Sequence, residues 1–271
     1  MTGDILLRAE RLSRTFAGPA GDVHACVDVD LTLRAGELLV VRGASGAGKT
    51  TLLNLLSGLD TPTAGRVELA GHDLADLGET ALAELRHREL GIVFQSFGLL
   101  PVLTAAENVE VPLRIAGTDP RERAERVAAA LADVGLADHA GQRPDELSGG
   151  QQQRVGVARA IVSGPRVLIA DEPTGQLDSR TAASVMDLLV GLVHARGLAA
   201  VVATHDSLLV ARADRVIELH DGRVTAADQP GGGSPAPAEA PGGGPPTRAE
   251  APGDGPSTRA EARLRRRAAA D

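Results

Sequence analysis

Apolar and polar residues follow one another along the chain in blocks that predict alternating strands and helices. Nearly uninterrupted apolar runs occupy 37–41, 167–170 and 199–203. A strand that is apolar on both faces is typical of a parallel sheet covered by helices on each side. The pattern therefore predicts an α/β fold whose central sheet contains these three segments.

Helix and turn signals lie between these runs. A helix is expected over 49–57, and a second over 119–134, which begins with Asp-Pro and ends before Gly135. Thr-Ala-Ala-Glu at 104–107 has the residues of a capping box and opens a further helix. The segment 214–226 is expected to form a hairpin with Asp-Gly at its turn. These signals are local, so they predict elements rather than their arrangement.

Composition changes after residue 228. Of the 43 residues from 229 to 271, 16 are Pro or Gly, and the end of the segment is rich in Arg. Such a segment buries too little apolar surface to offset its ordering entropy. We therefore expect one domain over 1–228 and a disordered tail over 229–271. Contact of the Arg-rich end with an anionic membrane or nucleic acid is one interpretation, and a solvated tail is the simpler one.

Charge and composition exclude several classes of protein. The net charge of −8 excludes a broadly basic nucleic-acid binder, so no nucleic-acid partner is expected. The chain has neither a long enough apolar stretch to span a membrane nor the pattern of a signal peptide. Cys26 is the single cysteine, which fits a small buried residue in a cytoplasmic protein. His24 and His72 show no metal-ligand spacing and are interpreted as incidental.

The strongest chemical signal directly follows the first apolar run. Residues 43–50 read Gly-Ala-Ser-Gly-Ala-Gly-Lys-Thr, the spacing of a phosphate-binding P-loop between a strand and a helix. Lys49 is the only lysine among 28 basic residues, and a compact ammonium suits the β- and γ-phosphates where a planar guanidinium does not. The Thr50 hydroxyl is placed to bind Mg²⁺. The residues expected to bind the nucleotide are Gly43, Ala44, Ser45, Gly46, Ala47, Gly48, Lys49, Thr50 and Thr51.

Two acids follow the apolar run at 167–170. Asp171 is expected to hold Mg²⁺, and Glu172 to polarise the attacking water as a general base. Two acids at the end of a strand are common in isolation. Together with a P-loop, they predict a nucleotide hydrolase that uses ATP and Mg²⁺.

Further motifs resemble those of the ATP-binding cassette (ABC) family and occur in the family's order over about residues 5–226. They match an adenine-stacking aromatic at Phe16, a lid glutamine at Gln95, the signature motif Leu-Ser-Gly-Gly-Gln at 147–151, the D-loop aspartate Asp178 and the switch histidine His205. The resemblance implies a P-loop NTPase with a RecA-like parallel-sheet core, an antiparallel β subdomain and an inserted helical subdomain at about 96–161. For Phe16, the alternative is an ordinary core residue.

The resemblance also implies a head-to-tail homodimer that encloses two ATP molecules. The signature loop would face the γ-phosphate held by the other copy, and Asp178 would position that copy's loop. His205 would touch the γ-phosphate and keep Glu172 and the water in line, and Gln95 would complete the Mg²⁺ site. The signature residues concerned are Ser148, Gly149, Gly150 and Gln151, the last of which also fits a structural role in the helix.

An apolar segment after Gln95 is expected to bind a membrane partner. It contains Phe97, Leu99, Leu100 and Val102, and in the family this region accepts a helix of the permease. Packing within the helical subdomain is the alternative. The permease is expected on a separate polypeptide, with this chain peripheral on the inner face of the cell membrane.

The local sequences of 93–101, 103–109 and 170–181 resemble those of the macrolide-export and lipoprotein-release branch of the family. The resemblance implies an FtsX-like permease that exports or extracts drugs, peptides or lipoproteins. Gln176 departs from the Asn expected there. An importer motor, or a cell-division-type ATPase that signals without transport, would share the catalytic residues. A DNA-repair ATPase would need a long coiled-coil insertion, but only 51 residues separate Gln95 from Leu147.

Overall fold

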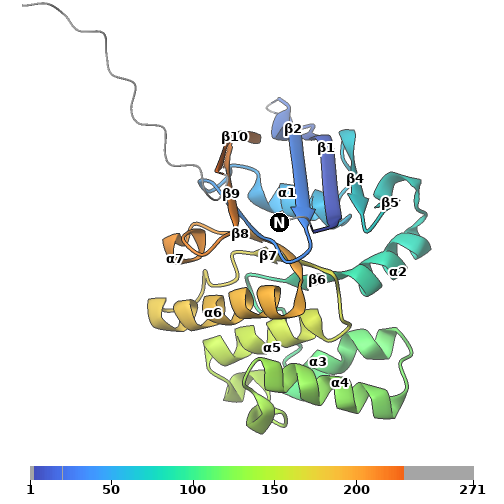
Figure 1. Ribbon diagram of the computed structural model, residues 1–271, viewed down its shortest axis with the longest axis vertical. Coiled ribbons are helices and arrows are strands. Elements are labelled where there is room, and N and C mark those ends of the chain that lie inside the picture. The colour runs from blue at the N-terminus through green and yellow to red at the C-terminus, as the bar shows by residue number, and fades with distance from the viewer. Residues whose placement is uncertain (1–2, 20, 229–271) are drawn as a thin grey trace, which may run out of the picture. The chain divides into compact units, whose positions relative to one another are not determined.

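Two sheets build the part of the chain that the structure describes, a computed structural model covering residues 3–19 and 21–228. The six-stranded sheet has the order β10-β9-β3-β8-β7-β6, and the four-stranded sheet has the order β2-β1-β4-β5 (Figure 1). The strands of the larger sheet are β3 (Leu38–Arg42), β6 (Leu90–Val93), β7 (Val167–Asp171), β8 (Ala199–Ala203), β9 (Arg215–His220) and β10 (Arg223–Asp228). The smaller, antiparallel sheet contains β1 (Ile5–Phe16), β2 (Val23–Arg34), β4 (Ala64–Leu69) and β5 (His72–Asp73). The predicted tail lies outside the described residues.

The three apolar runs form neighbouring parallel strands, as the pattern predicts. β3 pairs with β8, and β8 pairs with β7. Alternate residues of β3 face opposite sides of the sheet: Leu38 and Val40 belong to one apolar cluster, and Leu39 and Val41 to another. Because every second side chain enters a different core, both faces must be covered, and this explains the continuous apolar sequence.

Helices cover the sheet on both sides. They are α1 (Lys49–Leu56), α2 (Glu79–Glu89), α3 (Ala105–Ile115), α4 (Pro120–Asp133), α5 (Gly149–Ile161), α6 (Ser179–Arg196) and α7 (Ser207–Val210). α1 packs with the antiparallel sheet on one face, whereas α3 to α6 contribute to the cluster on the other. α3, α4 and α5 gather on the side away from the antiparallel sheet (Figure 1). Short 3₁₀ turns lie at Leu74–Asp76, Ala137–His139 and Pro144–Glu146.

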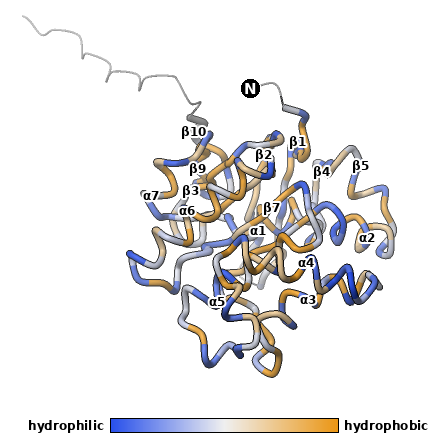
Figure 2. Tube along the Cα trace, turned by 60° about the horizontal axis from the view of Figure 1, so that its bottom comes forward, coloured by the Kyte–Doolittle hydropathy of each residue, from blue (hydrophilic) through white to orange (hydrophobic). Residues whose placement is uncertain are grey.

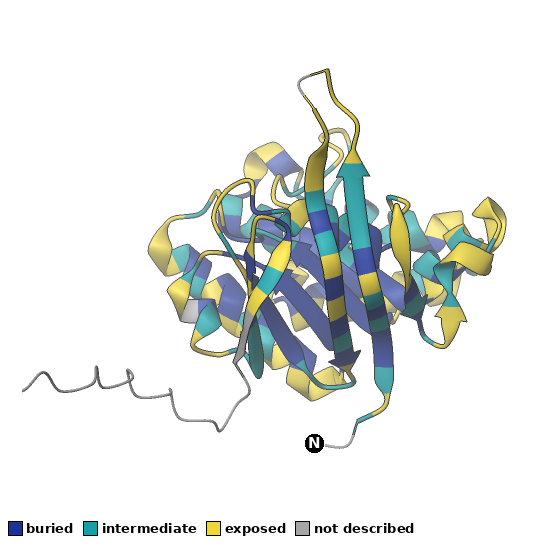
Figure 3. Cartoon of the chain, turned by 90° about the horizontal axis from the view of Figure 1, so that it is seen from above, coloured by how far each residue is buried: buried dark blue, intermediate teal, exposed yellow. Residues whose placement is uncertain are grey.

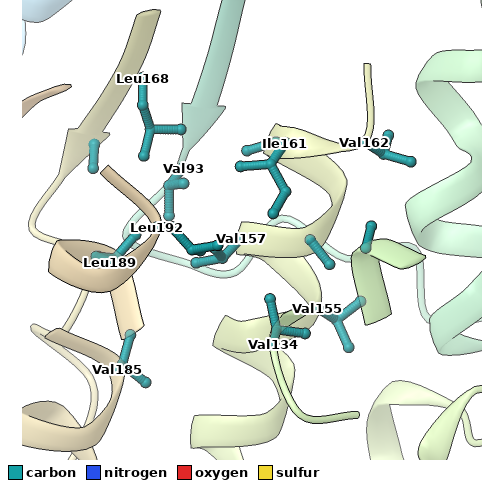
Figure 4. Packing of buried hydrophobic residues seen from close by; sticks show 14 of the residues in the cluster. Val93, Val134, Val155, Val157, Ile161, Val162, Leu168, Val185, Leu189 and Leu192 are labelled. Carbon is teal, nitrogen blue, oxygen red and sulfur yellow. The ribbon is translucent and has the colours of Figure 1, made fainter. Parts of the chain in front are cut away.

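Among the described residues, the buried core is mainly aliphatic and contains no aromatic side chain. Val157 and Ile161 of α5 point into the same cluster as Val93, Leu168 and Leu189 (Figure 4). Hydrophilic and hydrophobic residues alternate along the outer helices (Figure 2). The long β1–β2 hairpin instead runs from a buried base to an exposed end (Figure 3). The side chains at its exposed end are therefore not used to build the core.

Local signals are confirmed in detail. Thr104 and Glu107 form the capping box of α3. Asp221 and Gly222 adopt φ angles of 46° and 74°, the left-handed conformations that a tight hairpin turn requires. Cys26 is fully buried, and this burial raises the pKa of its thiol to about 11.

Removal of the cap of α4 is expected to lower stability without affecting catalysis. The Asp119 carboxylate accepts hydrogen bonds from the backbone N–H groups of Arg121 (2.9 Å) and Glu122 (3.4 Å). Asp119→Ala should lower the free energy of unfolding by about 1 kcal/mol, measured by urea titration. Asp138→Ala, at an exposed position without this cap, is the control. Equal losses in both variants would contradict the capping role.

Candidate active site

A cleft of about 1180 Å³ opens at the carboxyl ends of the parallel strands. The loops after β3, β6, β7 and β8 bring chemically active residues to one edge of the sheet, and the antiparallel sheet together with the turn between β9 and β10 supplies the facing wall. The predicted site residues that line the cleft are Phe16, Gly43, Ala44, Ser45, Gly46, Gly48, Lys49, Thr50, Thr51, Gln95, Asp171, Glu172 and His205. Residues far apart in the sequence therefore meet at a single site.

The loop at 43–48 needs its glycines because it passes close to two other strands. A Cβ on Gly48 would lie 2.1 Å from the Ala25 carbonyl oxygen, and Gly48 has a φ of 102°. A Cβ on Gly43 would lie 2.4 Å from the carbonyl oxygen of Leu219. Ala47 was also predicted to bind the nucleotide, but it is buried and does not line the cleft. The loop leads directly into α1, whose first residues, Lys49, Thr50 and Thr51, line the cleft. The first N–H groups of a helix have no acceptor within the helix and suit an anion.

Lys49 crosses the loop that precedes it. Its Nζ donates hydrogen bonds to the carbonyl oxygens of Gly43 (2.8 Å) and Ala44 (3.2 Å). The same Nζ lies 3.6 Å from Oε1 of Glu172, and the Lys49 side chain is only 10% exposed. An ammonium has three donors, so one remains for an anion in the cleft.

Thr50 and Asp171 offer oxygen atoms that suit a magnesium ion. The Thr50 hydroxyl donates to Oδ2 of Asp171 at 2.6 Å, while Oδ1 of Asp171 is buried without a hydrogen-bond partner. A buried carboxylate oxygen beside a hydroxyl fits a hard cation. Among the described residues, no cluster of three or more His, Cys, Asp and Glu could hold a metal alone. The set therefore fits Mg²⁺, which keeps water and phosphate oxygens among its ligands.

Glu172 occupies a strained backbone position, and its carboxylate lies between the ammonium of Lys49 and the imidazole of His205. Its φ is 43°, which is unfavourable by about 1–3 kcal/mol for a residue with a side chain. Its N–H donates to the Ala203 carbonyl oxygen at 2.9 Å, which fixes the turn after β7. Oε2 lies 3.0 Å from Nδ1 of His205, opposite the contact with Lys49. This carboxylate is placed to accept a proton from a water molecule in the cleft.

The signature residues and Asp178 lie outside this cleft, at the starts of α5 and α6. The Gln151 side chain accepts from the Ser148 N–H at 2.8 Å, and the Ser148 hydroxyl accepts from the Gln151 N–H at 3.3 Å, so the two residues form the capping box of α5. A Cβ on Gly150 would lie 2.2 Å from Cγ2 of Thr181, so α5 packs closely on α6 there and a side chain would fit only if Thr181 moved. Hydrogen bonds from the Thr181 side chain and backbone hold the pKa of Asp178 below its usual value.

The facing wall contains residues that the sequence analysis missed. These are Val23, His24, Ala25, Val27, Asp221, Gly222 and Arg223. His24 is not incidental: it lines the cleft, and its Nδ1 lies 3.0 Å from the Thr15 hydroxyl. The pairing of Phe16 with Val23 across the β1–β2 ladder brings this segment to the site. Nothing local in the sequence marks it, because strand register sets its position.

Comparison with known proteins agrees with this geometry. The model of the ABC transporter family matches residues 26–175. The macrolide export ATP-binding/permease protein MacB of Brucella melitensis is 48% identical over 224 residues, which cover 83% of this chain and 34% of that protein. MacB 1 of Yersinia pestis (strain Antiqua) is 46% identical, over 82% of this chain and 34% of its own length. The chain thus spans about a third of these relatives.

Solved structures show the same fold. The ABC transporter cassette MJ0796, solved as a dimer in a post-hydrolysis state with ADP and Pi, matches with a TM-score of 0.77 and 37% identity. That match covers 84% of this chain and 100% of the other. The cassette cbiO1 of Clostridium perfringens matches with a TM-score of 0.76 and 30% identity, over 84% and 89% of the two chains.

The phosphate loop, the carboxylates at the strand ends and the sheet topology define a P-loop nucleotide-binding protein with the α/β fold of an ATP-binding cassette. The chain belongs to the ABC transporter family. In the described residues, no helix combines the length and apolar character needed to cross a membrane.

Proposed function

We propose that this chain is the ATP-hydrolysing motor of an export-type transporter. The observation that carries the proposal is the Glu172 carboxylate, held between Nζ of Lys49 and Nδ1 of His205 beside the phosphate loop. The relatives named for macrolide export favour the export branch. The cargo class we expect is a drug, peptide or lipoprotein.

Hydrolysis follows from the positions of the chain's own groups. The loop N–H groups and Lys49 bind the β- and γ-phosphates, and the oxygen of a water molecule attacks the γ-phosphorus. Glu172 takes the proton of that water, while the bond between the γ-phosphorus and the oxygen bridging to ADP breaks. His205 holds Glu172 in line. Thr50, Asp171 and Gln95 would hold Mg²⁺, which when bound neutralises charge on the phosphate oxygens.

A second copy of the chain completes the proposed site. Ser148 and Gly149 stand at the start of α5, where the first N–H groups of the helix have no acceptor within the helix and suit an anion, although the Ser148 N–H itself donates to Gln151. Because they lie outside the cleft of their own chain, we propose that they face the γ-phosphate of the other copy, with Asp178 near the interface. ATP would then hold two head-to-tail copies together, and hydrolysis would release them.

The proposed permease contact lies just after Gln95. Leu100 and Val102 are 47% and 75% exposed, whereas Leu99 packs against the core. The buried Asn108 side chain accepts from the Leu100 N–H at 2.7 Å and donates to the Leu100 carbonyl oxygen at 3.1 Å. A rigid loop that presents apolar side chains to solvent is suited to binding a helix of a partner. The partner we expect is a permease on a separate polypeptide at the inner face of the membrane.

The test is affinity capture from native membranes with Glu172→Gln, with and without ATP. We expect recovery of an integral-membrane permease with a large extracytoplasmic domain. Leu100→Asp with Val102→Asp should abolish recovery, whereas Leu59→Asp, an exposed leucine elsewhere, should not. Recovery of a compact permease with a solute-binding protein would replace the exporter by an importer. Recovery of soluble partners alone would overturn the transporter proposal.

A further inference from the structure

A cation is stacked on the aromatic ring of the cleft's facing wall. The guanidinium carbon of Arg14 lies 4.5 Å from the centroid of the Phe16 ring. The two residues are two positions apart on β1, so their side chains share one face of the strand. A guanidinium at this distance from a ring is attracted to the ring's negative face.

Arg14 is itself anchored. One of its terminal nitrogens lies 2.8 Å from Oδ1 of Asp60, and the two side chains are only 24% and 25% exposed. The Asp60 N–H in turn donates to the Asn54 carbonyl oxygen of α1 at 3.2 Å. The same α1 begins at Lys49, so the anchor connects the ring to the helix that carries the phosphate loop.

The two sides of the Phe16 ring differ. Phe16 lines the cleft and is 40% exposed, whereas Arg14 is not among the lining residues. The ring therefore has the guanidinium against it and the open cleft beside it. Nε of Arg14 is buried without a hydrogen-bond acceptor, as expected for a guanidinium covered by stacking.

We propose that Arg14 is a positioning residue for the nucleotide base. It acts through Phe16, by holding an otherwise mobile exposed ring in the orientation that stacks on the base. A ring fixed before binding loses less conformational freedom on binding, which improves affinity. The inference rests on the proposed ATPase function. The site then has two parts: Phe16, held by Arg14, binds the base, and the phosphate loop with Lys49 binds the phosphates.

This division predicts a selective defect. Arg14→Ala should raise the Kd and KM for ATP about three- to tenfold and leave kcat within about twofold. The Kd for inorganic tripolyphosphate, which has no base, should not change. Because stacking tolerates any base, GTP should lose affinity to the same extent as ATP. Arg14→Lys keeps the charge beside Asp60 but loses the planar group that stacks on the ring. Its Kd for ATP should therefore lie between those of the unsubstituted protein and Arg14→Ala.

A double-mutant cycle tests the route through the ring. Phe16→Ala should weaken ATP binding, and the double variant Arg14→Ala, Phe16→Ala should bind no worse than Phe16→Ala alone. Arg66→Ala, which removes an exposed partner of Glu10 on the same sheet, is the matched control. Binding is measured by isothermal titration calorimetry on the full chain, and turnover by phosphate release.

Three outcomes would contradict the role of Arg14, and a fourth would contradict the role of Phe16. Additive losses in the cycle, or an equal loss of tripolyphosphate affinity, would overturn the positioning role of Arg14. Unchanged ATP affinity in Arg14→Ala would do so as well. If Phe16→Ala leaves ATP affinity intact, Phe16 does not stack on the base, and the role of Arg14 falls with it, whereas the proposed ATPase function does not depend on this result.

Discussion

Glu172→Gln is expected to lower ATP turnover by about a thousandfold while leaving ATP bound. The amide keeps the size of the side chain but cannot accept the proton of the attacking water. The backbone strain at φ 43° and the hydrogen bond to Ala203 do not depend on the carboxylate, so the fold should persist. Because ATP remains intact, the variant should accumulate as an ATP-bound dimer.

Two measurements check this expectation. Steady-state phosphate release gives the turnover, and size-exclusion chromatography with and without ATP gives the dimer. Glu218→Gln is the matched control, because that carboxylate lies 3.8 Å from Arg42 outside the catalytic set. Turnover at the wild-type rate in Glu172→Gln would remove Glu172 from the role of general base.

Lys49→Arg is expected to lower kcat/KM for ATP by about a hundredfold or more. The change keeps the charge, so the loss comes from shape. Nζ of Lys49 reaches two carbonyl oxygens of its own loop at 2.8 and 3.2 Å in a pocket that leaves the side chain 10% exposed. A planar guanidinium is larger and spreads its donors in a fixed fork, so it cannot occupy that space without moving the loop.

The measurement for Lys49→Arg is steady-state kinetics combined with calorimetric ATP binding. Thermal unfolding of the same variant separates a lost phosphate contact from a lost fold. Arg8→Lys, an exchange of the same two residue types at an exposed ion pair with Glu10, should leave turnover unchanged. A Lys49→Arg protein with wild-type kcat/KM would mean that any cation serves at this position.

Much of the candidate site could be predicted because its parts are contiguous in the sequence. The loop at 43–50 supplies its own glycines, its ammonium and its hydroxyl, and the strand before it sets its place at the edge of the sheet. Asp171 ends β7 and Glu172 directly follows it, so a strand sets their place as well. On the side of the cleft that contains Phe16, the resemblance to the ABC family predicted that residue alone. Val23 and His24 could not be predicted, since they reach the cleft only through the register of β2 on β1.

For some residues, the sequence identifies the position and only the folded chain shows its contacts. The sequence shows that Gly150 belongs to a signature-like motif, but only the packing of α5 on α6 shows that Thr181 leaves no room for a side chain. Likewise, Arg14 is one of many arginines in the sequence, and its contacts with Phe16 and Asp60 distinguish it only in the folded chain.

The sequence by itself determined the parallel strands, the helix caps, the phosphate loop and the two acids at the end of β7. These features depend on residues close together in the chain, whose spacing and intrinsic preferences operate before any long-range contact forms. The tertiary structure alone decided which strands are neighbours and that Val23 and His24 line the cleft. Such contacts join segments far apart in the chain. The distances between these segments are set by the close packing of the two apolar clusters on the two faces of the six-stranded sheet.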